Sequence, residues 1–297
     1  MLNPGYIAEL IFIGIATGAL YAIVAIGFNL VFGTMNILNL AHGAVLMIGS
    51  YGLLLSYYIG LENFWFAAAL GILLATITGL LIERLAVRPL RGHWWNTKVA
   101  TLGMAVFLEN LVMVITNGHP QNVPRPFDPT YYPVFADVEV SDFQILLILI
   151  SIGVMSGMIW FLRKTPWGRA IRVLAQSPDI AKCVGINIDR ITILGFAVSG
   201  LLAGLAGILN AATFGSTYPF VGTLIGLKGI VVLIVAGIGN MRGALYVALV
   251  LGIVETLAVG FGGSAYRDVF AYVSMVLILM VRPHGLFGEE ARVVREV

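Results

Sequence analysis

Apolar residues run along most of the chain in long stretches that are separated by short polar segments. At least eight of these stretches come close to the roughly 20 residues that a helix needs to cross a bilayer. Transmembrane barrel strands would be shorter and would alternate apolar and polar residues, whereas these stretches are apolar on every face. The pattern therefore predicts an all-α integral membrane protein, a polytopic bundle of eight to nine transmembrane helices. We expect these helices over 6–32, 37–60, 63–83, 99–116, 143–162, 191–213, 223–240, 243–260 and 266–281.

The overall composition fits a membrane protein. Hydrophobic residues make up 59% of the 297 residues and charged residues only 11%, whereas roughly a quarter of the residues of soluble domains are charged. The first 30 residues contain no Lys or Arg, so the basic start of a cleavable signal peptide is missing and we expect this segment to remain as a span. The single cysteine, Cys183, excludes an internal disulfide and a multi-thiolate metal site within one chain.

Basic residues are unevenly distributed along the chain. Thirteen of the 17 Lys and Arg residues fall in the segments 84–98, 163–190 and 282–297. The positive-inside rule predicts that these segments, and with them the carboxyl terminus, are cytoplasmic. The segment 117–142 is acidic and rich in proline, so we expect an ordered, non-helical loop on the opposite side. No basic residue orients the first two spans, which leaves the side of the amino terminus open.

Two apolar segments are interrupted by glycine and polar residues where an ordinary span would have leucine. The first interruption covers 33–43, and the second covers 226–229 and 237–243. Broken helices within a membrane are tolerated where they line a cavity or are buried in protein. Both segments are therefore expected to border a pathway, and either could be re-entrant. Their candidate pathway residues are Asn36, Asn39, His42, Lys228 and Asn240.

A structural role is the alternative for several of these residues. Asn36, Asn39 and His42 could form interhelical hydrogen bonds that only hold the fold together. Most of the 35 glycines, including the pair Gly200 and Gly204, are expected to allow close packing of helices.

Glu109, Lys228 and Glu255 are the ionisable residues deepest in the predicted spans. Each should cost at least about 2.5 kcal/mol at the bilayer centre unless it is paired or hydrated. They are therefore further candidates for the pathway. The alternative is a structural ion pair between Lys228 and either Glu255 or Glu109 that never contacts a ligand.

Sequence motifs of energy-converting and hydrolytic enzymes are missing. There is no Gly-x-x-x-x-Gly-Lys-Ser/Thr phosphate loop, no His-Glu-x-x-His zinc pair and no Gly-x-Ser-x-Gly nucleophile turn. We therefore predict no enzymatic activity, no catalytic or metal-binding residues and no cofactor in this chain. If transport is energised, a partner supplies the energy.

The segment from Gly168 to Arg190 is basic, contains a proline and separates two predicted spans. Together with the flanking spans it resembles the coupling loop of bacterial ABC permeases. The resemblance extends over nearly the whole chain to one family, the membrane subunits of high-affinity branched-chain amino acid importers. The stretches that carry it are 36–49 (NILNLAHGAVLMIG), 88–91 (RPLR), 168–190, 226–243, 252–255 (GIVE) and 282–288 (RPHGLFG).

This resemblance implies one permease domain over 1–297 in the bacterial inner membrane, with a cytoplasmic coupling loop (163–190) and an extracytoplasmic loop (117–142). It further implies a second permease chain, homologous or identical, and two ATP-binding subunits that use the ATP. A soluble binding protein would contact loop 117–142 and the turns at 218–220 and 262–263. No nucleic acid is expected among the partners.

The resemblance also implies how an ATPase would be coupled to transport. A short helix over 178–184 would sit in a groove on an ATPase subunit, with Ile180 and Val184 as its apolar face. ATP-driven closure of the ATPases would then rock the spans around the pathway. An ordinary basic loop is the alternative. The residues assigned to ATPase coupling are Gly168, Arg169, Arg172, Ala175, Asp179, Lys182, Gly185 and Asp189.

The cargo is less well defined than the family. The resemblance implies branched-chain or other amino acids, urea or short amides, or aromatic or other carboxylates, with specificity residing largely in the binding protein. Glu109 stands where the family pattern has a neutral glutamine. An extra acid near the pathway disfavours a simple carboxylate cargo, unless Lys228 or a protonated Glu109 compensates.

Two other functional classes stay open. An ion-coupled secondary carrier or a channel would need only this chain and a gradient, and Glu109, Lys228 and Glu255 are compatible with ion coupling. Such a carrier has no need for the segment 168–190. A subunit that serves only assembly is the third possibility, and the interrupted segments argue against it.

Overall fold

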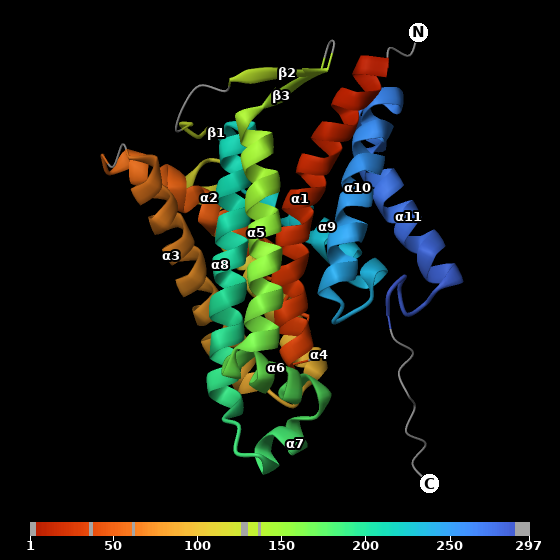
Figure 1. Ribbon diagram of the computed structural model, residues 1–297. Helices are drawn as coiled ribbons and strands as arrows, with labels where there is room; N and C mark the ends of the chain where they lie inside the picture. Colours follow the sequence, from red (N-terminus) through yellow and green to blue (C-terminus); the bar gives the residue numbers. More distant parts are fainter. Residues whose placement is uncertain (1–3, 36–37, 61–62, 126–129, 136–137, 289–297) are drawn as a thin grey trace.

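The computed structural model describes residues 4–35, 38–60, 63–125, 130–135 and 138–288, which form a bundle of helices with short strands at one end (Figure 1). Each of the nine predicted apolar ranges coincides with a long helix. These helices are α1 (Pro4–Met35), α2 (His42–Tyr58), α3 (Phe64–Ile82), α4 (Trp94–Ile115), α5 (Asp142–Lys164), α8 (Ile188–Phe214), α9 (Val221–Ala236), α10 (Met241–Gly262) and α11 (Arg267–Val281).

Six helices of the described chain are long and apolar enough to cross a membrane, namely α1, α3 with its continuation to Leu90, α4, α5, α8 and α10. The helices α2, α9 and α11 have 17, 16 and 15 residues. At a rise of about 1.5 Å per residue they are shorter than the roughly 30 Å hydrocarbon core. The structure thus confirms an all-α polytopic membrane protein, whereas the number of eight to nine transmembrane helices stays a prediction.

The loop between α4 and α5 is non-helical in its described parts, as predicted. It contains β1 (Gln121–Asn122), β2 (Tyr131–Phe135) and β3 (Val138–Ser141), and β2 pairs antiparallel with β3. β1 pairs antiparallel with β4 (Ser216–Thr217), which follows α8, so the loop is tied to the end of that helix. A capping box at Ser141 then starts α5.

Short helical elements connect the long helices. α3 continues into a π-helical turn, η1 (Glu83–Val87), and a 3-10 turn, η2 (Arg88–Leu90). α5 is followed by α6 (Pro166–Gln176) and α7 (Pro178–Cys183), and η3 (Ser264–Tyr266) joins α10 to α11. α7 confirms the short helix predicted in the coupling loop, whereas α6 is an element that the predicted ranges do not include.

The helices α1 and α8 form the centre of the bundle. The spanning parts of α1 and α8 are 72% and 67% buried, against 28%, 28% and 22% for α3, α4 and α5. α1 packs so closely on α10 that a Cβ on Gly252 would lie 2.3 Å from the carbonyl oxygen of Gly14. α8 packs similarly on α3, where a Cβ on Gly204 would lie 2.7 Å from Cβ of Ala75. Small residues thus let these backbones approach, as expected for Gly204.

The helices α2 and α9 begin inside the bundle rather than at one of its ends. His42, the first residue of α2, contacts Gly27, which lies about two turns before the end of α1. In the first turn of α9, a Cβ on Gly222 would lie 2.0 Å from the carbonyl oxygen of Gly43. The first predicted interruption is confirmed for residues 38–41, which are non-helical, whereas 33–35 belong to α1 and 42–43 to α2. Asn36 lies outside the described residues.

One part of the second predicted interruption is wrong. The stretch 226–229 lies within the continuous helix α9, and its glycines serve packing, since a Cβ on Gly229 would lie 2.6 Å from Cγ1 of Val24. An unbroken helix is favoured there because every backbone N–H and C=O in an apolar interior needs a partner. The chain breaks only after α9, where Gly237 and Gly239 have φ angles of 90° and 88°, which favour glycine.

The two ends of the bundle differ in charge. The start of α1 and the strands β1–β3 lie at one end, which we call the loop end (Figure 1). The connection between α3 and α4 and the helices α6 and α7 lie at the other, the basic end (Figure 1). Phe287, which follows α11, lines a cavity together with Arg172 of α6 and so belongs to the same end. The described parts of the three basic segments therefore lie opposite loop 117–142, as predicted. The start of α1, which the charge pattern leaves unassigned, lies with the loop.

Candidate functional site

Four polar side chains from four helices meet in the interior of the bundle. Nζ of Lys228 on α9 lies 3.0 Å from Oε1 and 3.1 Å from Oε2 of Glu255 on α10, and 3.1 Å from Oδ1 of Asp268 on α11. The hydroxyl of Tyr21 on α1 donates a 2.8 Å hydrogen bond to Oε2 of Glu255 and accepts one of 3.2 Å from Lys228. Of the two pairings considered for Lys228, the structure shows the one with Glu255.

This cluster is buried, and helix geometry brings it together. The side chains of Lys228 and Glu255 are only 6% and 1% exposed. α1 and α10 pack antiparallel (Figure 1), and side chains lean toward the amino-terminal end of their own helix, so Tyr21 and Glu255 lean toward each other. Because an unpaired buried charge costs several kcal/mol, each member of the pair stabilises the other.

A cavity of about 340 Å³ lies between Lys228 and the loop end, and we call it the charged cavity. Residues of α1, α8, α9 and α11 form its walls. Its apolar lining consists of Leu20, Phe214, Val221, Leu224 and Ile225. Its polar lining consists of Thr17, Tyr21, Asn210, Ser216, Tyr218, Lys228, Arg267 and Asp268.

The charges at this cavity balance. Lys228 and Arg267 are positive, Asp268 is negative, and Glu255 lies directly against Lys228. Nε of Arg267 is buried and has no hydrogen-bond partner in the described part of the chain, while the Asp268 side chain is 51% exposed. Burial raises the pKa of the Tyr218 hydroxyl, which therefore lines the cavity as a neutral group. The cavity thus presents to a solute one guanidinium and one half-exposed carboxylate, whose Oδ1 is already paired with Lys228.

Glu109, the third predicted pathway residue with a charge, is separate from this cluster. It is buried on α4, and its Oε1 accepts a hydrogen bond from the hydroxyl of Thr223 in the first turn of α9. Thr223 follows Gly222, which contacts Gly43 of α2. Glu109 therefore lies beside the junction of α2 and α9, and it is not the partner of Lys228.

Asn39 and His42 lie at the start of α2 and bind neighbouring backbone and side chains. Oδ1 of Asn39 accepts a 3.2 Å hydrogen bond from the backbone N–H of Ala41. Nδ1 of His42 lies 3.1 Å from the hydroxyl of Ser199 on α8, and its ring centroid lies 4.4 Å from that of Phe28 on α1. The contact of His42 with α8 fits the alternative of an interhelical hydrogen bond, whereas the hydrogen bond of Asn39 is local. Neither lines the charged cavity, and their pathway role stays a prediction.

Asn240 fixes the turn between α9 and α10. Its Oδ1 accepts a 2.9 Å hydrogen bond from the N–H of Gly243, and its Nδ2 donates one of 3.0 Å to the carbonyl oxygen of Phe287. Asn240 also lines a cavity of about 660 Å³ at the basic end, together with Arg172 and Ala175 of α6. The structure thus brings one predicted pathway residue together with two residues predicted to couple to an ATPase.

The helix α7 presents apolar side chains at the surface of the basic end. Ile180 and Val184 are 56% and 62% exposed. The exposed side chains of Asp179 and Lys182 form an ion pair of 3.5 Å, and Gly185 follows the helix with a φ angle of 75°. The role of this surface in docking to an ATPase stays a prediction.

The helix α6 folds back against α5. A Cβ on Gly168 would lie 2.3 Å from the carbonyl oxygen of Phe161, so glycine permits this close contact. Arg169, Arg172 and Ala175 are exposed on α6. All predicted coupling residues other than Asp189 therefore lie on α6, on α7 or directly after α7.

Asp189 is engaged within the chain. It binds Arg88 at 3.0 Å and also pairs with Arg91. Arg91 in turn binds the buried carboxylate of Glu83 at 2.6 Å. These four residues tie η1 and η2 to the start of α8. The role of Asp189 in ATPase coupling stays a prediction.

Several residues of these sites are not among those predicted from the sequence. Tyr21 is one of many aromatic residues in the apolar runs, and no local signal distinguishes it. Arg267 and Asp268 stand at the start of a predicted span, where charges are common. α6 does have a signal in the sequence, because Thr165 followed by Pro166 is a pattern typical of helix starts. In the structure Pro166 is the first helical residue, and Thr165 accepts a 3.0 Å hydrogen bond from the N–H of Gly168.

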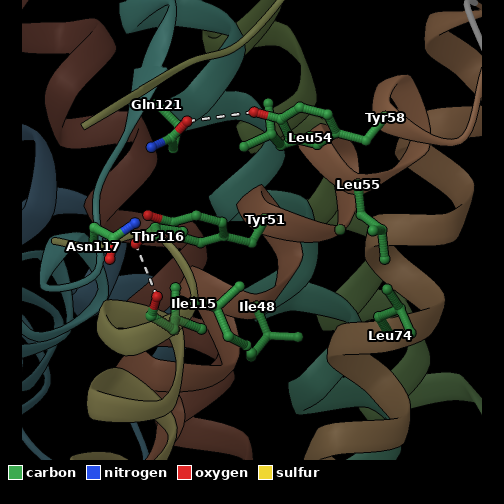
Figure 2. Close-up of a pocket in the computed structure, with 12 residues that line it drawn as sticks. Ile48, Tyr51, Leu54, Leu55, Tyr58, Leu74, Ile115, Thr116, Asn117 and Gln121 are labelled. Carbon is green, nitrogen blue, oxygen red and sulfur yellow. Dashed lines mark hydrogen bonds between the residues drawn. The ribbon is translucent and has the colours of Figure 1, made fainter. Parts of the chain in front are cut away.

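Another cavity, of about 470 Å³, lies between α2, α3 and α4 near the loop end (Figure 2). Figure 2 shows the hydroxyl of Tyr51 directed toward Thr116 and Asn117. The hydroxyl of Tyr58 donates a 3.4 Å hydrogen bond to Oε1 of Gln121. None of the described residues that line this cavity carries a charge, so it matches a charged solute less well than the charged cavity does.

Comparison with known proteins assigns the chain to a family. Residues 10–279 match the family model described as the branched-chain amino acid transport system permease component. The chain belongs to this family. The high-affinity branched-chain amino acid transport permease LivH of Escherichia coli K12 is 31% identical over 302 residues, which cover 95% of this chain and 96% of LivH. BraD of Pseudomonas aeruginosa, a permease of the same description, is 33% identical over 289 residues, or 93% of this chain and 94% of BraD.

A more distant relative differs in its described cargo. The ribose import permease RbsC of Escherichia coli K12 is 27% identical over 272 residues, which cover 88% of this permease and 81% of RbsC. The solved structure of PsaBC from Streptococcus pneumoniae in complex with Fab covers 94% of this chain, with a TM-score of 0.48 and 12% identity. A likeness that distant supports no conclusion about function. The family resemblance of the sequence motifs is confirmed.

Proposed function

We propose that this permease is the membrane-spanning subunit of an ATP-driven, binding-protein-dependent importer of branched-chain amino acids or a related small polar solute. Family membership supports the permease role, and the charged cavity supports an amino acid as cargo. A zwitterionic amino acid would place its carboxylate at Arg267, its ammonium at Asp268 and its aliphatic side chain against residues such as Leu20 and Ile225. The observation that carries this assignment is a pair of opposite charges beside an apolar lining.

Charge balance favours a zwitterion over the alternative cargoes. LivH and BraD are described as branched-chain amino acid permeases and RbsC as a ribose permease. Ribose, urea and short amides carry no net charges to match Arg267 and Asp268. A simple carboxylate would bring a like charge close to Asp268. An amino acid matches both side chains.

The proposed pathway leads from the charged cavity past the pair of Lys228 and Glu255 to the junction of α2 and α9. Glu109, Asn39 and His42 flank this junction, and Asn36 belongs to the same interrupted segment of the sequence. Asn240 would border the pathway at the basic end. Two helices that begin inside the bundle support this route, because interrupted helices in transporters commonly surround substrate sites.

The partners would bind at the two ends. α7 would dock in a groove on an ATP-binding subunit through Ile180 and Val184, and two such subunits would bind and hydrolyse the ATP. A second permease chain, homologous or identical, would complete the membrane part. A soluble binding protein would contact the loop end through loop 117–142 and the turns at 218–220 and 262–263. The basic end and the carboxyl terminus would face the cytoplasm at the bacterial inner membrane.

ATP-driven closure of the two ATP-binding subunits would move α7 and, through it, the rest of the basic end. α6 packs against α5 at Gly168, and Asp189 joins the start of α8 to the connection between α3 and α4. A displacement of α7 would therefore reach α5, α8 and the connection between α3 and α4. Such rigid-body motion around a central site is a common form of alternating access.

Uptake by proteoliposomes tests the proposed function. Vesicles that contain the permease with its candidate partners are expected to accumulate leucine only when the binding protein is present on one side and ATP on the side of α7. Arg267→Met is expected to lower this uptake with the complex still assembled. The matched control is Arg84→Met, which replaces an exposed arginine at the basic end outside the coupling loop. Uptake that ignores ATP but follows an imposed ion gradient would instead establish a secondary carrier.

A further inference from the structure

The cavity of about 660 Å³ at the basic end, which we call the arginine cavity, carries an excess of positive charge. Arg163 at the end of α5, Arg172 on α6 and Arg242 in the first turn of α10 line it, and no acidic side chain is among its described lining residues. All three arginines are exposed, and the ion pairs found in the described chain involve other residues. The amino-terminal end of α10 adds further partial positive charge. This combination suits an anion.

The remaining lining residues are mostly apolar and come from α5, α6, the turn between α9 and α10, the start of α10 and the chain after α11. They include Ile159 and Leu162 of α5, Met241 of α10 and Phe287, which follows α11. A small soluble anion gains nothing from such walls, whereas the glycerol and acyl part of a lipid does. The cavity lies where long apolar helices meet the basic end, at the level expected for lipid head groups.

An apolar groove of about 170 Å³ adjoins the arginine cavity at one lining residue. Phe287 lines both spaces, and its ring centroid lies 6.3 Å from that of Tyr246. The groove is bounded by α9, α10 and α11, and its lining includes Val250, which is 60% exposed. Arg242, Tyr246 and Val250 are spaced four residues apart, so they follow one face of α10 from the arginines into the groove.

We propose that these two spaces bind one anionic phospholipid, with its phosphate among Arg163, Arg172 and Arg242 and one acyl chain in the groove. Arginine donates paired hydrogen bonds to phosphate oxygens, and basic pockets between membrane helices on the cytoplasmic side are typical sites for anionic head groups. The proposal rests on the proposed orientation of the permease and not on its cargo. The lipid joins α5 and α6 to α10 at the base of the coupling helix α7.

Two other groups with negative charge compete for the arginine cavity. Glu289 and Glu290 follow Phe287 within three residues in the sequence, and an ATP-binding subunit could also supply an acidic side chain. Neither of these groups needs the apolar groove that adjoins the cavity at Phe287. A phospholipid is favoured because it uses the positive charge and the groove together.

Native mass spectrometry of the purified permease tests the proposal. After exchange into phosphatidylglycerol or phosphatidylcholine of equal chain length, the permease is expected to retain phosphatidylglycerol selectively. The substitutions Arg163→Gln, Arg172→Gln and Arg242→Gln are made singly and together. Retention of phosphatidylglycerol should fall about fivefold for each arginine removed. The matched control replaces Arg84, Arg169 and Arg190 by Gln, which removes the same charge from the basic end without touching the cavity.

A second variant tests the acyl chain separately from the head group. Val250→Trp fills the groove from an exposed position, so the permease is expected to fold normally. It should lose retention of long-chain phosphatidylglycerol while still binding glycerol phosphate as the unmodified chain does. Circular dichroism and size-exclusion chromatography establish that each variant is folded before lipids are compared.

Three results would overturn the proposal. The first is a lack of selectivity, seen either as equal retention of the two lipids or as a loss of retention in the control triple variant that equals the loss in the cavity variants. The second is a gain of lipid binding when the chain is cut after Gly288, which would make the carboxyl-terminal acids the normal occupant. The third is full displacement of the lipid when the ATP-binding subunits are added.

Discussion

The ion pair of Lys228 and Glu255 is compatible with a structural role and with a role in transport. The pair is almost fully buried, and a buried ion pair is weak evidence for stability, because a well-packed apolar replacement is often as stable. Lys228 also lines the charged cavity, and Glu255 lies directly against Lys228. Removing one charge and removing both charges should therefore have different consequences.

A double substitution at this pair separates the two roles. Lys228→Met alone is expected to destabilise the permease by about 3–5 kcal/mol, because it leaves Glu255 buried without a compensating charge. The double variant Lys228→Met with Glu255→Leu should recover most of this loss. If the pair belongs to the pathway, the double variant still fails in uptake. Thermal unfolding of the solubilised complex and uptake by proteoliposomes provide the two measurements.

Recovery of both stability and uptake in the double variant would instead show that the pair only holds the helices together. Tyr21→Phe serves as the control for the hydrogen bonds around the pair. It removes one hydroxyl and no charge, but this hydroxyl donates to a buried carboxylate. We therefore expect a loss of about 1.5–3 kcal/mol in stability, less than that of Lys228→Met. A larger loss would mean that the hydroxyl, and not the charge pair, dominates the cluster.

At the scale of helices, the short elements carry the features that distinguish this bundle. α2 and α9 begin inside it, held by the contact between Gly43 and Gly222. α7 lies at its surface and buries little of its own apolar side chains. An exposed apolar face on a short helix contributes little to folding, and it is available to a partner.

Substitutions on α7 test that availability. Ile180→Asp with Val184→Asp is expected to weaken co-purification of the ATP-binding subunit by about tenfold or more, since burying each side chain contributes about 1.5–3 kcal/mol. The melting temperature of the isolated permease should not change, because both residues are exposed. Cys183→Ser, on the same helix, is the matched control. Unchanged co-purification would show that α7 is an ordinary surface helix with no part in docking.

At the scale of the whole molecule, the distribution of charge predicts the orientation in the membrane. The described parts of the three basic segments share one end, and loop 117–142 occupies the other (Figure 1). Cys183 is exposed at the basic end and is the only cysteine of the chain. The native sequence therefore contains a single reactive site that reports which end faces the cytoplasm.

Labelling with a membrane-impermeant maleimide measures this orientation. In membranes without the ATP-binding subunits, Cys183 is expected to react only when the reagent reaches the cytoplasmic face. The variant Cys183→Ser with Thr130→Cys moves the thiol to an exposed position in loop 117–142, and it should react only from outside. The reverse pattern in both proteins would invert the proposed topology.

Local patterns along the chain were sufficient to predict the positions of the nine long helices, the grouping of the basic segments and the family. The reason is that these properties depend on neighbouring residues. An apolar run favours a helix in an apolar environment because its backbone bonds are satisfied within the run. The charge of each connecting segment can be counted directly, and the motifs of the family are short stretches such as 36–49 and 282–288.

The arrangement of the site depends on packing between distant parts of the chain. Lys228 lies 27 residues from Glu255 and 207 from Tyr21, so no local pattern shows that it pairs with Glu255 rather than Glu109. The unbroken course of α9 and the entry of Arg267 into the charged cavity are likewise results of tertiary packing. Close glycine contacts set how the helices approach and rotate, and that rotation decides which side chains meet.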